Sequence, residues 1–88
     1  MIISGLVIQY NPALTDSVVA QLRAAPGVSE ITLLERGRVV CVLEAVSPEA
    51  SASVVNQLVQ VEGIYTVMPT YIYDLEEEDR WSSPAVLS

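Results

Sequence analysis

Two stretches of the chain decide its fold, namely PALTDSVVAQLRAAPGV at residues 12–28 and PEASASVVNQLVQVEGI at residues 48–64. They align at a constant offset of 36. Each opens on a proline, which suits the first turn of a helix, and closes on a glycine before a β-branched residue, which suits the start of a strand. The sequence therefore predicts one βαβ unit used twice. The identical positions are Pro12/Pro48, Ser17/Ser53, Val18/Val54, Val19/Val55, Gln21/Gln57, Leu22/Leu58 and Gly27/Gly63.

The segments around these stretches are apolar and rich in β-branched residues, which favours strands at residues 2–10, 28–35, 38–46 and 64–73. Arg36-Gly37 predicts the turn of a hairpin between the second and third of them. The order is then β-α-β-β-α-β, and right-handed crossovers predict a ferredoxin-like α+β sandwich with a four-stranded antiparallel sheet and both helices on one face. We expect one domain over residues 1–74 and an acidic, disordered tail over residues 75–88.

Capping residues predict where the helices begin. Asn11 suits the N-cap of a first helix that starts at Pro12, with Thr15 or Asp16 as alternative later starts. Ser47 suits the N-cap of a second helix that starts at Pro48.

Composition restricts the partners of the chain. Its 88 residues carry a net charge of -7, which argues against binding to a nucleic-acid backbone. No apolar run reaches the length of about 18 residues that a membrane-spanning helix needs. The N-terminus shows no basic region followed by an apolar segment and a cleavage site, so we expect a cytoplasmic protein without an export signal.

Residues that carry catalytic chemistry are scarce. The chain has no histidine and a single cysteine, Cys41, which we expect to be a small core residue. Neither the phosphate-binding pattern GxxxxGK[ST] nor the dinucleotide pattern GxGxxG occurs. The sequence therefore predicts neither an enzyme nor a cofactor or metal site.

The uncovered face of the predicted sheet is expected to be aliphatic, and the repeat requires equivalent residues of the two halves to share a face. With Ser4 and Glu44 placed outward, the central strands expose Leu6, Ile8, Val40 and Val42. The flanking strands then expose Thr32, Leu34, Thr66, Met68, Thr70 and Ile72. The residues expected under the helices are Ile3, Gly5, Val7, Ile31, Val39, Cys41, Leu43 and Val67. The opposite parity, which exposes Gly5 and Gln9, stays open. An exposed apolar face of this kind indicates an interaction site or a homodimer interface.

Four segments of the chain together point to a known family. They are residues 4–9 (SGLVIQ), the junction from Leu22 to Val28, residues 39–45 (VVCVLEA), and residues 61–67 (VEGIYTV), which lead to Tyr71 and an acidic tail. These segments resemble the NapD family of small cytoplasmic chaperones for periplasmic nitrate reductase. The resemblance covers roughly residues 2–79. It implies a ferredoxin-like fold and binding of the twin-arginine signal peptide of the nitrate reductase catalytic subunit, whose export is delayed until the molybdenum cofactor is loaded. It implies no catalytic residue.

The resemblance and the face together give a binding hypothesis, in which the apolar sheet holds the peptide and acidic residues attract its arginines. The expected partner is the signal peptide of a molybdenum-containing nitrate reductase, bound by a monomer or weak homodimer that does not insert into membranes. The alternative for the acidic run is a solvated tail that aids solubility. The predicted binding residues are Leu6, Ile8, Val40, Val42, Glu44, Met68, Thr70 and Ile72, and the predicted electrostatic rim is Asp74, Glu76, Glu77 and Glu78.

Two other classes of protein share the predicted fold. A ligand-sensing module of the Lrp effector-domain type would form oligomers through its sheet and bind amino acids between subunits. A heavy-metal carrier would need a Cys-x-x-Cys motif, which this chain lacks.

Overall fold

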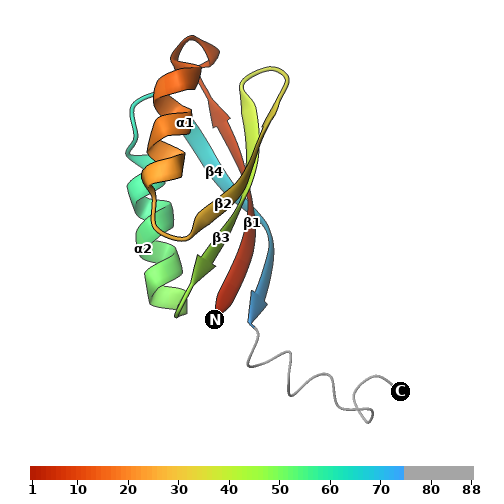
Figure 1. The fold of residues 1–88 in the computed structure, drawn as a ribbon, viewed down its shortest axis with the longest axis vertical. Coiled ribbons are helices and arrows are strands. Elements are labelled where there is room, and N and C mark those ends of the chain that lie inside the picture. Colours follow the sequence, from red (N-terminus) through yellow and green to blue (C-terminus); the bar gives the residue numbers. More distant parts are fainter. Residues whose placement is uncertain (75–88) are drawn as a thin grey trace, which may run out of the picture.

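The computed structural model describes residues 1–74 as a four-stranded sheet with two α-helices packed against one face (Figure 1). The strands are β1 (Ile2–Tyr10), β2 (Val28–Leu34), β3 (Arg38–Ala45) and β4 (Ile64–Asp74). The helices are α1 (Thr15–Ala24) and α2 (Pro48–Val59), and a short 3-10 helix, η1 (Pro12–Leu14), precedes α1. The observed order of α-helices and strands matches the predicted β-α-β-β-α-β.

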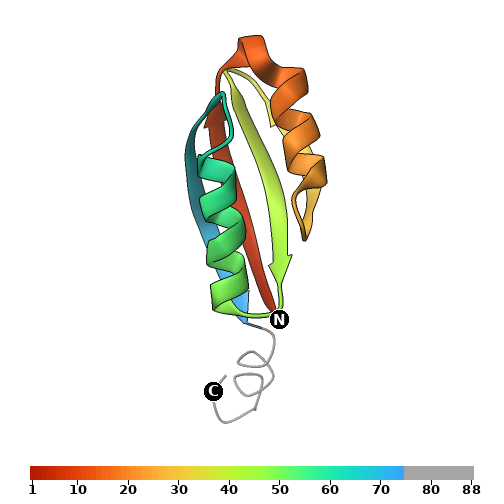
Figure 2. The same ribbon diagram turned by 90° about the vertical axis from the view of Figure 1, so that its left-hand side faces the viewer.

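The strands lie side by side in the order β2-β3-β1-β4, and every neighbouring pair is antiparallel. The central strands are therefore β3 and β1, as a ferredoxin-like sandwich requires. In Figure 2 both helices lie in front of the sheet and run roughly along its strands. The predicted fold class is confirmed.

The two helices repeat the same packing at the predicted offset of 36. Val18 and Leu22 are the buried residues of α1, and Val54 and Leu58 are those of α2. Each pair is spaced by one helical turn, so each helix turns one apolar stripe toward the sheet. The hydrophobic core is completed by residues of the strands, namely Leu6, Ile8, Tyr10, Val39, Cys41, Leu43 and Ile64.

The connections into the two helices differ, although both contain a capping residue and a proline. The Ser47 side chain accepts a hydrogen bond of 3.1 Å from the backbone N–H of Ala50 and caps α2, as predicted. Asn11 accepts one of 3.0 Å from Ala13, but it caps η1 rather than α1. The first α-helix therefore begins at Thr15, one of the two later starts that the sequence left open.

The glycine that ends each predicted unit has a left-handed backbone, with φ of 80° at Gly27 and 95° at Gly63. At Gly27 a side chain is excluded for a second reason, because a Cβ atom there would collide with the carbonyl oxygen of Glu44. The same approach lets the Glu44 N–H donate a 2.9 Å hydrogen bond to the Gly27 carbonyl. This contact fixes the start of β2 against the end of β3.

Candidate functional site

The sheet face opposite the helices has no covering layer within residues 1–74 (Figures 1 and 2). Its central part is apolar and half-buried, with Ile3 and Val7 from β1 and Val40 and Val42 from β3. We call this surface the open face. Across its strands Val7 is paired with Val40 on one side and with Met68 on the other, which makes an apolar row.

The predicted place of the β1 residues was wrong. Leu6 and Ile8 are 1% and 0% exposed and belong to the core under the helices, and Ser4, which was placed outward, is 3% exposed. The predictions for β3 are confirmed, because Val40 and Val42 are half-buried on the open face while Val39, Cys41 and Leu43 are buried. Ile3, Gly5 and Val7 replace Leu6 and Ile8 on the open face, which is the parity that the sequence left open for this strand.

The register explains this error. Even-numbered residues of β1 are paired with odd-numbered residues of β3, for example Leu6 with Cys41, and paired residues share a face. An even offset such as 36 therefore relates strand residues on opposite faces. The ends of the two strands show this change of face. Tyr10 at the end of β1 is 5% exposed and lies in the core, whereas Val46, its equivalent in the repeat, follows β3 and is 81% exposed.

The outer strand β4 changes face part of the way along its length. Thr66 and Met68 lie on the open face as predicted, paired with Gln9 and Val7. The register then shifts between Gly5 and Leu6, and Thr70 is the extra residue. Beyond this bulge Tyr71 and Tyr73 occupy the open face.

Ile72 was therefore predicted on the wrong face. It is paired with the buried Ser4 and lines a depression on the helix side with Val55 of α2. The two tyrosines, which sequence reasoning missed, contact each other edge to face with ring centroids 6.0 Å apart. Pro69 inside the predicted strand was the available signal, because proline within a strand often marks a bulge.

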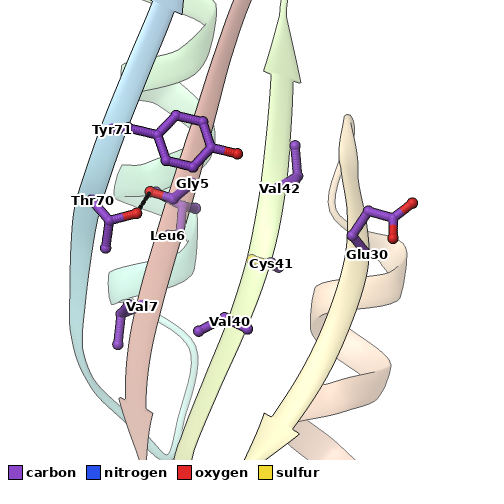
Figure 3. A pocket seen from close by; sticks show the side chains of 9 residues that line it. All are labelled: Gly5, Leu6, Val7, Glu30, Val40, Cys41, Val42, Thr70 and Tyr71. Atoms are coloured by element: carbon purple, nitrogen blue, oxygen red, sulfur yellow. Dashed lines mark hydrogen bonds between the residues drawn. The ribbon is translucent and has the colours of Figure 1, made fainter.

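A depression of about 200 Å³ lies in the open face beside this bulge (Figure 3). A Cβ atom at Gly5 would collide with the ring of Tyr71, so the absence of a side chain at Gly5 lets the tyrosine lie over β1. The hydroxyl of Thr70 donates a 3.2 Å hydrogen bond to the Gly5 carbonyl. The lining residues are Gly5, Leu6, Val7, Glu30, Val40, Cys41, Val42, Thr70 and Tyr71.

Charged residues lie at the two ends of the open face and, with Glu30 of β2, at its β2 border, but not on the central strands between those ends. Glu44, one of the predicted binding residues, is exposed, is paired with Ile3 and lies at one end. Arg38, exposed and paired with Gln9, lies at the other. Asp74 is the last residue of β4, and the other predicted rim residues, Glu76, Glu77 and Glu78, lie outside the described residues. The central strands of the open face are therefore apolar in the middle, with a negative charge at the Glu44 end and a positive charge at the Arg38 end.

The described part of the chain contains no group of three or more residues that could hold a metal ion. The Cys41 thiol is buried, and burial raises its pKa to about 11, so it carries little of the reactive thiolate near pH 7. No helix within residues 1–74 is long and apolar enough to cross a membrane. Fold and site together define a small ferredoxin-like binding domain with an apolar sheet surface.

Comparison with known proteins identifies the family. The family model described as NapD protein matches residues 1–76. A solved structure, the solution structure of the E. coli Tat proofreading chaperone protein NapD, is 27% identical, with a TM-score of 0.71, over 78% of this chain and 74% of that one. No curated protein sequence matches the chain. The chain belongs to the NapD family.

Family membership also decides between the classes that the sequence left open. The protein has a chaperone role and is not an enzyme, as expected. The Lrp-type effector module and the heavy-metal carrier, which shared the predicted fold, are set aside in favour of the chaperone family.

Proposed function

We propose that the open face binds the twin-arginine signal peptide of a periplasmic nitrate reductase catalytic subunit in the cytoplasm. Binding holds the peptide back from export until the molybdenum cofactor has been loaded. The observation that carries the proposal is the apolar row formed by the exposed Met68 and the half-buried Val7 and Val40 on a sheet face that nothing covers within residues 1–74. The family and the E. coli Tat proofreading chaperone support it.

The shape and chemistry of the open face suit an apolar peptide segment. Val7, Val40 and Val42 form a floor, while Met68 and Tyr71, which are 61% and 45% exposed, rise at its β4 border. Methionine adapts to differently shaped apolar partners, and tyrosine offers a large apolar ring with little conformational entropy to lose. A helical apolar segment laid on this floor would bury side chains from one of its faces.

The charges at the two ends suggest the direction in which the peptide lies. A twin-arginine signal peptide has its basic region ahead of its apolar stretch, so its arginines would lie toward Glu44 and its apolar stretch over Val7 and Val40. The opposite orientation would bring the arginines toward Arg38, where like charges repel.

The tail is proposed to add to this attraction. Residues 75–88 include Glu76, Glu77 and Glu78, and they follow directly on β4, which borders the open face. An acidic segment tethered at that border would raise the local concentration of a basic peptide.

The test is calorimetric titration of the full chain with a synthetic twin-arginine signal peptide of a periplasmic nitrate reductase catalytic subunit. Met68→Asp introduces a charge into the apolar row and is expected to weaken binding at least about tenfold, because burying an unpaired charge is costly. Val59→Asp is the matched control, since Val59 is 45% exposed on α2, on the other side of the sheet. Equal affinity of the Met68→Asp protein and the wild type would remove the open face from the proposal.

A further inference from the structure

Glu30 lies in a β-bulge at the β2 border of the depression. Ser29 is paired with Val42 and Thr32 with Val40, so Glu30 and Ile31 together oppose the single residue Cys41. The bulge allows Ile31 to pack against the core while Thr32 stays on the open face. Glu30 is the extra residue, and its side chain lines the depression.

The backbone at Glu30 is left-handed, with φ of 53°. Residues with a Cβ atom rarely adopt this conformation, and glycine holds it without strain. Glycine at position 30 would therefore form this bulge with less backbone strain than glutamate. The bulge has a structural role in placing Ile31 and Thr32, but the fold does not require a carboxylate at position 30.

The surroundings of Glu30 supply no partner for its charge. Within residues 1–74 no arginine pairs with this carboxylate, and the side chain is exposed to solvent. Opposite to it, at the β4 border of the same depression, lie Thr70 and Tyr71, and the floor between the two borders is formed by valines and Gly5 (Figure 3). An occupant of the depression would thus lie between an apolar floor and one negative charge.

We propose that the Glu30 carboxylate forms a hydrogen-bonded ion pair with an arginine of the peptide bound on the open face, and that this pair makes binding specific for arginine. The inference rests on the function proposed above and names the residue that distinguishes arginine from other side chains. A carboxylate can receive two parallel N–H donors from a guanidinium group, which lysine cannot supply. The apolar floor reduces the access of water to such a pair and strengthens it.

The experiment measures the affinity of two proteins for two peptides. The proteins are the wild type and Glu30→Gln, and the peptides are the signal peptide and the same peptide with its two arginines replaced by glutamine. We expect Glu30→Gln to weaken binding of the arginine peptide about five- to tenfold, between the effect of an exposed pair and that of a charge-assisted hydrogen bond. Binding of the glutamine peptide should be unchanged by Glu30→Gln.

Glu30→Gly adds an independent readout, because it removes the carboxylate and the backbone strain together. Its melting temperature should rise while its affinity for the arginine peptide falls as for Glu30→Gln. Glu62→Gln is the control for net charge, since Glu62 lies beyond α2 and lines a depression on the helix layer. This control should bind like the wild type.

The outcomes separate this inference from the function on which it rests. If the wild type binds the arginine peptide and Glu30→Gln binds it equally well, the specificity role is wrong and the proposed function stands. If Glu30→Gln weakens both peptides by the same factor, Glu30 does not pair with arginine. If the wild type binds neither peptide, the proposed function itself fails.

Discussion

The Cys41 side chain is 3% exposed between the two helices and the sheet, opposite Leu6 of the neighbouring strand. Its pKa is raised from 9.0 to about 11 because burial disfavours the thiolate. A raised pKa in the folded state stabilises the protein below the unfolded pKa, and this contribution is lost as the pH rises through the folded value. The affected range therefore runs from about pH 9 to about pH 11.

We predict that the wild type loses up to about 2 to 3 kcal/mol of unfolding free energy from this group across that range, at about 1.4 kcal/mol per pKa unit. Urea unfolding at several pH values checks it. The control is Cys41→Ala, which is less stable at neutral pH because of the cavity but lacks the thiol. Parallel pH profiles for the two proteins would contradict the assignment.

At the scale of secondary structure, the two capping residues provide a matched pair. Ser47 caps an α-helix that supplies Val54 and Leu58 to the core, whereas Asn11 caps only the short η1. We predict that Ser47→Ala lowers the unfolding free energy by about 1 kcal/mol and Asn11→Ala by less, measured by urea denaturation. An equal or larger effect at Asn11 would mean that η1 and α1 form as one unit.

The helices were predictable from the sequence because their signals are local. Ser47, Pro48 and Gly63 mark the limits of the second helical unit by themselves, and the apolar stripe follows from the spacing of Val54 and Leu58. The hairpin at Arg36-Gly37 was predictable for the same reason, since both residues adopt the left-handed backbone that such turns require.

The open face was only partly predictable, because the face of a strand residue depends on register. A shift by one residue moves every side chain of a strand to the other face. Leu6 and Ile72 were misplaced in this way, the first because the repeat offset of 36 relates strand residues on opposite faces and the second because of the bulge at Thr70. Glu30 was missed because a single glutamate between Ser29 and Ile31 does not by itself indicate a bulge.

At the scale of the whole molecule, the net charge of -7 acts on any basic partner. If the tail attracts the signal peptide, affinity should fall severalfold when salt is raised from about 0.05 M to about 0.3 M, because the screening length shortens well below about 10 Å. Replacing Glu76, Glu77 and Glu78 by glutamine should lower the affinity and flatten this response. Calorimetry at the two salt concentrations measures both effects.

The control for this prediction is Glu49→Gln/Glu62→Gln, which removes charge from the helix side of the molecule. It should retain most of the salt response. A wild-type affinity that does not change with salt would leave the tail with the role of keeping the protein soluble.

Pro69 has a consequence for the behaviour of the protein at high concentration. It lies within β4, a strand at the edge of the sheet that carries Met68, Tyr71 and Tyr73 with much of their surface exposed. An unbroken apolar edge of this length would invite a second copy of the chain to add its own edge strand, and repetition of that contact leads to fibres. A proline cannot donate the backbone hydrogen bond that such growth requires. Under the proposed function, Pro69 would limit pairing of β4 with a second copy of the chain and so leave the open face available for the signal peptide.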